Sequence, residues 1–519
     1  MQKSSDYKPL TWAEQQFLNG CIVGARVEIG SDLPTASEEK KVIRAELIRA
    51  ALLRELSDVR LHSKGVRIKG ATIAGRLDLQ GADIDFDLSL SNTVLEKAPN
   101  FVNARIRSLS LDGSHCPGLN ADHCVFDGSV FLRAGFKSTG EISLPGAIIV
   151  GDLQVCDAEI RSQTGIGIFA ASSEIRRSVY LGEYPYDNMN SGLKVDGAIL
   201  FPSCEISRDF YISNISLYVD ERSLPAAGNG LQTPTALSLN RGKINGVLYF
   251  KHNQISRGIV NFAGLQARRL NDEPADEYEN FSIRLDGFEY QGFSDEADTR
   301  LTTRLDWLSR RPNALEFTSQ PYEHLASILL KIGHRNDALD VLFEREKLRH
   351  RANRDNIRKH RNGLWRLPIL KLNDLLLRYM IGYGYRPFLS LLWAILLISL
   401  LALLFQKTWD AGDFAPNSAP ILVSADWVAA TEKHSKNPAE FWSSKAQAGQ
   451  DYETFHALAY STDLLIPIVN LGQEDAWAPS TTRSAWGWHA WWIRWLAKII
   501  GWVVTALGAA AVTGAIRRF

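Results

Sequence analysis

The sequence predicts a mainly β cytoplasmic head, a right-handed parallel β-helix or solenoid with helical caps, followed by an α-helical module that spans the membrane twice. Three observations predict it. A short alternating theme recurs from Gly65 to about Tyr290. Two long apolar runs lie in the last quarter of the chain, and a dense basic segment precedes the first of them.

Residues 1–64 are expected to form an N-terminal helical cap. Trp12 to Gly24 and Ser37 to Leu56 both show the apolar spacing of amphipathic helices. The open end of a solenoid exposes unpaired strand edges, which must be covered. These two helices are therefore predicted to close the first coil.

Residues 65–295 are expected to form the solenoid. Leu88, Leu109 and Val130 are twenty-one residues apart, and Leu77 and Leu88 are eleven apart. A fixed short period indicates a repeat architecture, and alternation with period two indicates strands. A β-sandwich is the alternative, since it also has many short strands, but it has no reason to keep an eleven-residue step. In this register Leu153 points inward and Gln154 points outward.

Two segments are predicted to leave the solenoid as loops, 183–191 and 220–234. The first is the candidate partner-contact loop, because its composition is suited to contact with a cytoplasmic protein or a small molecule. A solvated insertion is the alternative. The candidate contact residues are Tyr184, Tyr186, Asp187 and Asn188.

Residues 296–386 are expected to form a helical connector with basic juxtamembrane helices. A helical pair broken at Gly333 loosely resembles one tetratricopeptide unit and would close the solenoid. From Arg345 to Arg386 the chain carries twelve Lys and Arg residues. Such an excess beside a membrane span indicates the cytoplasmic side.

The two transmembrane helices are predicted at 387–406 and within 494–519. Pro387 to Gln406 is twenty residues without a charge, and Ile499 to Ile516 is a second apolar run. Twenty apolar residues suffice to cross a hydrocarbon core of about 30 Å. Arginines flank both runs on the inner side, so we expect a multi-pass protein of the bacterial inner membrane, with both termini in the cytoplasm and 407–493 outside.

The composition argues against several functional classes. The chain has 58 basic and 58 acidic side chains, so no nucleic-acid partner is expected. Five cysteines without a CxxC pair indicate reduced thiols, and the first ten residues lack a signal-peptide core. Dinucleotide, phosphate-loop, zinc-protease and serine-hydrolase motifs are absent. We therefore predict no catalytic residue, no metal ligand and no cofactor. The acidic cluster from Asp272 to Glu279 is interpreted as a solvated loop.

The segment 452–473 has the pattern of a pore helix. Its first half has helical spacing, Pro467 would end the helix, and a glycine turn follows. The candidate pore-loop residues are Ser461, Thr462, Asp463, Asn470, Gly472 and Gln473. The sequence Gly382-Tyr-Gly-Tyr385 precedes the first span, beside Arg386, so it is not interpreted as an ion filter.

The order of span, pore-helix-like segment and span resembles the two-transmembrane pore-loop ion channels over roughly the last 130 residues. No TVGYG sequence occurs, and Leu471-Gly-Gln473 stands in its place. The whole chain also resembles uncharacterised bacterial membrane proteins with a cytoplasmic pentapeptide-like or β-helix head, some labelled membrane-associated oxidoreductases. The segments that carry this resemblance are Val42 to Arg49, Gly382 to Pro387 and Tyr460 to Pro467.

These observations leave three hypotheses. The first is a channel-like effector whose head senses a ligand or binds a partner, and the second is a non-conducting anchored scaffold. The third, less favoured, is an enzyme on the solenoid. A small-residue face on the second span would let helices associate, so the lipid bilayer and further copies of the chain are the expected partners. This candidate helix-packing face consists of Ala506, Ala510 and Gly514.

Overall fold

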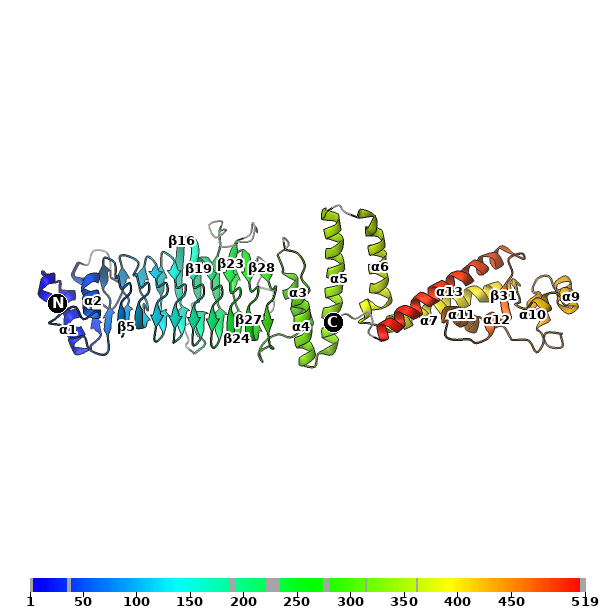
Figure 1. The fold of residues 1–519 in the computed structure, drawn as a ribbon, viewed down its shortest axis with the longest axis horizontal. Helices are drawn as coiled ribbons and strands as arrows, with labels where there is room; N and C mark the ends of the chain where they lie inside the picture. Colours follow the sequence, from blue (N-terminus) through cyan, green and yellow to red (C-terminus); the bar gives the residue numbers. More distant parts are fainter. Residues whose placement is uncertain are drawn as a thin grey trace. The chain divides into compact units, whose positions relative to one another are not determined.

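The computed structural model describes residues 3–34, 39–186, 192–220, 234–273, 281–312, 315–360 and 363–513. The chain divides into two compact units, Met1–Val341 and Leu342–Phe519 (Figure 1). The first unit holds large parallel β-sheets and the second is helical. Each is described by itself.

The described strands of the first unit form two large sheets in which every pairing is parallel. The first sheet contains β1 (Val27–Glu28), β3 (Val66–Lys69), β5 (Asp83–Ser91), β7 (Arg105–Ser110), β10 (Val125–Phe126), β11 (Val130–Leu132), β14 (Ile148–Ile149), β15 (Leu153–Cys156), β17 (Glu174–Ile175), β18 (Val179–Gly182), β20 (Glu205–Ile206), β21 (Phe210–Ser213), β24 (Lys243–Lys251), β27 (Gln266–Asp272) and β29 (Glu289–Tyr290). The second contains β2 (Val42–Arg44), β4 (Thr72–Ala74), β6 (Val94–Leu95), β8 (His115–Cys116), β9 (Leu119–Asn120), β12 (Phe136–Ser138), β13 (Ile142–Ser143), β16 (Ala158–Phe169), β19 (Leu193–Leu200), β22 (Ile215–Tyr218), β23 (Thr235–Ser238), β25 (Gln254–Ile255), β26 (Gly258–Asn261) and β28 (Phe281–Arg284).

The pairing register follows the sequence period. Leu88 pairs with Leu109 and Leu109 with Val130, as the twenty-one-residue step requires. Val130 then pairs with Leu153, and all four side chains are buried. Parallel strands in register stack like side chains on like, which builds one continuous apolar interior.

Gln154, predicted to point outward, is not exposed to solvent as that prediction implied, since its side chain is only 3% exposed. Gln154 stands in register between Phe131 and Tyr180 on the neighbouring strands. Its Oε1 also accepts a hydrogen bond of 2.9 Å from Arg133. Long neighbours cover this outer position, which period-two alternation alone does not reveal.

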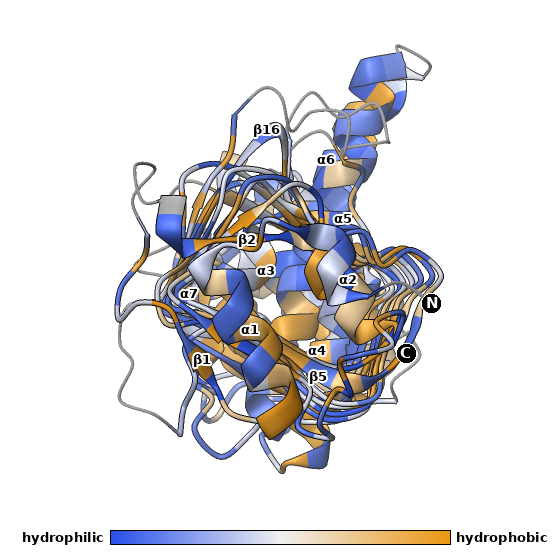
Figure 2. Ribbon diagram, turned by 90° about the vertical axis from the view of Figure 1, so that its left-hand side faces the viewer, coloured by the Kyte–Doolittle hydropathy of each residue, from blue (hydrophilic) through white to orange (hydrophobic). Residues whose placement is uncertain are grey.

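Helices α1 (Trp12–Val23) and α2 (Ala45–Leu52) lie across the N-terminal end of the stacked strands (Figure 2), with the short turns η1 (Ser4–Tyr7) and η2 (Glu39–Lys41) beside them. Thr11 begins α1 by accepting a hydrogen bond from the Glu14 amide. Glu14 is fully buried and binds Arg44 at 2.6 Å. The predicted helix over 37–56 is shorter in the structure, because 42–44 pair with β4 as β2.

The C-terminal end of the strands meets α3 (Leu301–Ser309), α4 (Gln320–Lys331) and the start of α5 (Arg335–His360). Arg304 of α3 forms a fully buried ion pair with Asp272 at 2.8 Å, and its guanidinium lies over the Phe293 ring. Gly333 separates α4 from α5 with φ of +90°, so the predicted break falls where a left-handed residue is needed.

The second unit contains two helices long and apolar enough to cross a membrane, α7 (Phe388–Asp410) and α13 (Ala485–Val512). The other elements are η5 (Leu364–Arg366), α6 (Leu367–Met380), η6 (Gly382–Gly384), β30 (Phe414–Pro416), α8 (Ala419–Leu422), α9 (Ala425–Lys433), α10 (Pro438–Trp442), α11 (Ala457–Leu465), α12 (Gln473–Ala476) and β31 (Trp477–Pro479). Helix α7 matches the predicted span, whereas α13 begins nine residues before 494.

Candidate functional site

The candidate site lies where α11 packs against both apolar helices. Helices α7, α11 and α13 contact one another pairwise. The Tyr460 ring of α11 meets the Phe405 ring of α7 edge-on, with centroids 4.9 Å apart. On the other side, the Leu465 carbonyl lies directly against Gly501 of α13. The predicted pore-helix-like segment is thus a helix held between the two candidate spans.

The depth of α11 follows from the pairing of the two long helices. Gly508 of α13 lies beside Ser390 of α7, and the two helices run in opposite directions. Gly501, seven residues before Gly508, is therefore roughly level with residue 397, near the middle of α7. Leu465, at the end of α11, reaches this level. The segment accordingly runs about halfway along the spans.

The chain turns back after α11 through a loop closed by Asp463. The Asp463 carboxylate accepts hydrogen bonds from the amides of Leu471 at 2.5 Å, Gln473 at 2.8 Å and Glu474 at 3.3 Å. Gly472 adopts a left-handed conformation with φ of +79° at the turn. Asp463 thus satisfies three backbone donors of the loop.

Gln473 ties the end of this loop to the beginning of α11. Its Oε1 accepts from the His456 amide at 2.8 Å, and its Nε2 donates to the Glu453 carboxylate at 2.8 Å and to the Thr454 carbonyl at 2.9 Å. The side chain is buried. The Gln473 side chain therefore links the two ends of the segment 453–473.

The remaining candidate pore-loop residues belong to the same local structure. The hydroxyls of Ser461 and Thr462 donate to carbonyls one turn earlier in α11. The Asn470 Oδ1 accepts from the Gly472 amide at 2.8 Å. The structure thus brings the six predicted residues together in α11 and the loop after it, where Asp463 and Asn470 bind backbone amides of the loop. Ile468, at its tip, is 84% exposed.

A charged cluster that sequence reasoning missed lies beside the loop. Glu474 binds Arg494 at 2.9 Å and also Lys498, both from α13. By the pairing above, Lys498 is roughly level with Leu400, near the middle of α7. In the sequence, the sign of this cluster was the spacing of Arg494 and Lys498, two cations one turn apart in a mainly apolar stretch. In a helix that crosses a membrane, ionisable groups near the middle are costly and typically functional.

A pocket of about 260 Å³ joins the loop to this cluster. Its wall combines acids, an amide and a cation with the indole of Trp502. The residues that carry the argument are Asp463, Asn470, Glu474, Lys498 and Trp502. A polar recess is therefore enclosed by the re-entering loop and α13.

Asp413 joins the C-terminal end of α7 to the start of α13. This buried carboxylate accepts hydrogen bonds from the Gly487 amide at 3.0 Å and from the Ser484 hydroxyl. Arg483 donates to the carbonyls of Gly412 and Phe414, both at 2.8 Å. The start of α13 is thus capped by residues that follow α7, and the spans are held at a defined offset.

The predicted helix-packing residues lie away from the contact within the chain. Ala506 is exposed and Ala510 is half-buried, while Gly514 lies outside the described residues. The face of α13 that is buried is a different small-residue face: Ala490, Ala497, Gly501, Val504 and Ala511. Ala506 and Ala510 remain open to a helix of another chain.

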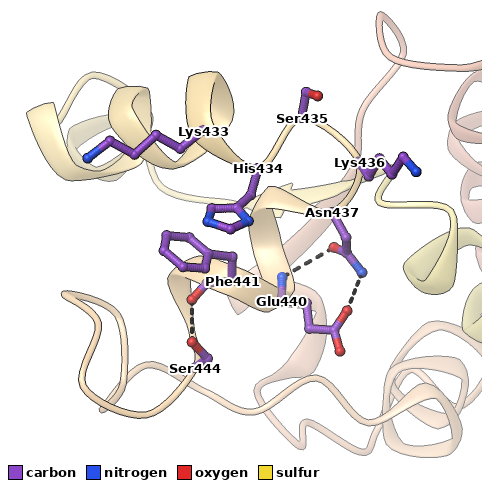
Figure 3. A pocket seen from close by; sticks show the side chains of 8 residues that line it. All are labelled: Lys433, His434, Ser435, Lys436, Asn437, Glu440, Phe441 and Ser444. Carbon is purple, nitrogen blue, oxygen red and sulfur yellow. Dashed lines mark hydrogen bonds between the residues drawn. The ribbon is translucent and has the colours of Figure 1, made fainter.

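A further pocket, of about 540 Å³, lies between α9 and α10 (Figure 3). The His434 ring stacks on Phe441, and Asn437 caps α10 by accepting from the Glu440 amide at 3.2 Å. Asn437 also donates to the Glu440 carboxylate at 2.8 Å. These polar groups serve the local fold and supply no evident chemistry.

The outer face of the head carries a ladder of stacked tyrosines. Tyr180, Tyr211 and Tyr249 occupy equivalent positions on β18, β21 and β24, and their rings stack with centroids 4.8 Å and 4.1 Å apart. Tyr184 of the predicted contact loop meets Tyr180 edge-on, and Tyr186 in turn meets Tyr184. Asp187 and Asn188 lie outside the described residues. The loop thus begins on an aromatic surface.

The described residues contain no cluster of metal ligands: no three His, Cys, Asp or Glu side chains lie close enough together to hold a metal ion. All five cysteines are buried, and burial raises the pKa of Cys21 to about 12 and that of Cys116 to about 11. Thiols with such pKa values are poor nucleophiles.

Comparison with known proteins adds no family. No protein-family model matches this sequence, no curated protein matches it, and no solved structure matches it.

Proposed function

We propose that the protein is a channel-like effector of the inner membrane, in which a cytoplasmic β-solenoid controls a two-span module. The observation that carries this proposal is the position of α11 between α7 and α13. A plain anchor would place residues 452–473 in an external loop. Instead, α11 packs against both apolar helices as far as the middle of α7, and the chain returns through a loop whose amides bind Asp463.

A loop at that depth must line a cavity or be buried in protein, because lipid cannot satisfy its backbone groups. Its tip at Ile468 is exposed in the single chain. Two spans cannot enclose a pore by themselves, so we propose a homo-oligomer in which several loops meet around an axis. The open face with Ala506 and Ala510 would supply contacts between copies.

We propose that the head is a right-handed β-helix, because its strands pair in parallel about twenty-one residues apart along the chain and crossovers between parallel strands are right-handed as a rule. We place both termini and the head in the cytoplasm, because the segment before α7 is rich in basic residues.

The tyrosine ladder and the loop beginning at Tyr184 form the surface proposed to bind a cytoplasmic protein or small molecule. Aromatic side chains offer large contact areas for such recognition.

A non-conducting scaffold is the second candidate, and a specific observation favours it. Asp463 and Gln473 are fully engaged in shaping the loop, and Glu474 is paired with two cations. These side chains are therefore not free ligands for an ion. A conducting loop would have to use its exposed backbone carbonyls.

Ion flux from liposomes separates the two candidates. Full-length protein, protein lacking residues 1–341, Asp463→Asn and the control Asp451→Asn are reconstituted at equal density. A channel conducts in the wild type, changes its flux when the head is removed, and loses flux in Asp463→Asn while Asp451→Asn conducts normally, because only Asp463 closes the loop. Tight liposomes for all four proteins, with correct oligomers in detergent, favour the scaffold.

A further inference from the structure

A basic pocket of about 370 Å³ lies between α5 and α6, in the unit that contains the candidate spans. Five cations and two acids contribute to its wall. Its cations are Arg351, Arg354 and Arg358 of α5 and Lys371 and Arg378 of α6. The wall therefore has an excess of three positive charges.

The two acids are already engaged. Asp374 binds Arg354 at 2.6 Å and accepts a hydrogen bond from the Tyr383 hydroxyl. Asp355 pairs with Arg358 at 3.1 Å. Within the described part of the chain, Arg351, Lys371 and Arg378 form no ion pair. Three cations thus converge on one recess without a protein anion to neutralise them.

Helix α6 presents the opposite kind of surface on its other side. Lys371, Asp374 and Arg378 share the face toward α5, whereas a stripe three and four residues apart is apolar. This stripe is exposed, with Trp365 at 68% and Ile369 at 60%. It consists of Ile369 and Leu372 of α6, Trp365 of the preceding turn η5, and Tyr379, which also borders the pocket. Trp and Tyr with aliphatic neighbours are typical of a helix lying at a membrane interface.

The position of α6 relative to α7 agrees with a location at a membrane interface. Helix α6 ends at Met380 and α7 begins at Phe388, eight residues later. Between them, the buried Tyr383 adopts a left-handed conformation, and its ring stacks on His350 of α5. Figure 1 shows α6 running across the direction of α7 and α13. A helix that crosses the direction of the candidate spans, beside the first residue of one of them, has the orientation of an interfacial helix.

We propose that this pocket binds the phosphate of an anionic phospholipid of the inner leaflet, with the apolar stripe of α6 inserted beside the acyl chains. Guanidinium groups bind phosphate in bidentate fashion, and lysine adds a point charge. Basic pockets at the cytoplasmic side of membrane helices are suited to anionic headgroups. The adjoining apolar stripe favours a lipid over a free phosphate, because only the lipid also supplies hydrocarbon.

The site rests on the membrane location of the protein and is independent of whether it conducts. It is tested with the full-length chain in detergent, by native mass spectrometry of retained phosphatidylglycerol against phosphatidylcholine. The double variant Lys371→Gln/Arg378→Gln is compared with Lys359→Gln, which removes an exposed cation of α5 outside the pocket. Separate arms add inorganic phosphate or glycerophosphoglycerol, the headgroup without its chains.

We expect the wild type and Lys359→Gln to retain phosphatidylglycerol selectively, and the double variant to bind it about thirtyfold more weakly, the combined contribution of two cations near an anionic lipid. Ile369→Ser/Leu372→Ser should weaken lipid binding as well. Equal retention of both lipids by the wild type would overturn the proposal. So would displacement of the lipid by inorganic phosphate or glycerophosphoglycerol at concentrations comparable to the lipid, since the chains would then contribute nothing. Circular dichroism confirms that each variant is folded.

Discussion

The carbonyl oxygen of Leu465 occupies the space that a Cβ atom on Gly501 would need. Gly501 is buried in α13, and its missing side chain allows the last turn of α11 to approach the helix backbone directly. This contact sets the depth to which the loop after α11 enters the module.

Replacing Gly501 with leucine should therefore push α11 away from α13. We expect the thermal unfolding midpoint of the detergent-solubilised protein to fall by several degrees, since overpacking costs about 1–3 kcal/mol or more. Ala509→Leu, on an exposed face of the same helix, is the matched control. If both variants melted together with the wild type, the close approach of Leu465 to Gly501 would be disproved.

Glu474 should be essential because it neutralises two cations of α13. Glu474→Gln leaves Arg494 and Lys498 without their anion, and breaking such a pair costs on the order of 3 kcal/mol. We expect loss of the folded membrane module, measured by protease resistance of α13 in proteoliposomes. Glu432→Gln, in the exposed part of α9, should have no effect. A second change, Lys498→Gln, should partly restore resistance in the Glu474→Gln protein.

The inward register of the head predicts a contrast between adjacent residues of β22. Leu217 is buried and pairs with Val195, whereas Ser216 points outward beside Lys194. Leu217→Asp would bury an unpaired carboxylate and should lower the free energy of unfolding of the head by several kcal/mol. Ser216→Asp should be nearly neutral. Circular dichroism melts at the β-sheet band check this, and equal losses would contradict the register.

The head should lose stability in acid through its ion pairs. Hydrogen bonds from Arg107 lower the pKa of Asp87, and those from Arg300 lower that of Asp298. A carboxyl whose folded-state pKa is lowered stabilises the fold above the unfolded value, near 3.9, and this contribution is lost as the pH falls through the folded value. We therefore expect melting temperatures to fall below about pH 4.

Asp87→Asn should reduce stability at neutral pH and flatten that acid-induced loss. Arg107→Gln should do the same, and the double variant should add little, because the two residues form one pair at 2.9 Å. Additive effects of the two changes would show that this ion pair is not the source of the pH dependence.

The pairing of strands about twenty-one residues apart and the first long apolar helix could be predicted from the sequence because each depends on a local pattern. Leu88, Leu109 and Val130 pair as their spacing requires, and the charge-free run at 387–406 coincides with α7. Alternation told less about the outer face. Gln154 is buried there by Phe131 of β11, by Tyr180 of β18 and by Arg133, which follows β11.

The rest of the candidate site depends on contacts between distant segments. Helix α13 begins early because Asp413, more than seventy residues away, binds the Gly487 amide at its first turn. The pairing of Glu474 with Arg494 and Lys498 likewise requires the loop to fold back on α13. The pattern of helix, proline and glycine placed the six candidate residues in one short segment, whereas the hydrogen bonds that they form appear only in three dimensions.

The most direct test of the re-entrant loop is a single cysteine at Ile468, the exposed tip of the loop after α11. The five native cysteines are buried, so the new thiol is the reactive one. A membrane-impermeant methanethiosulfonate is added to conducting proteoliposomes that carry Ile468→Cys or the control Val423→Cys, a residue 81% exposed between α8 and α9. Our account predicts that the reagent blocks ion flux through Ile468→Cys and leaves flux through Val423→Cys unchanged. Complete labelling of Ile468→Cys without any change in flux would contradict a loop that lines the conduction path.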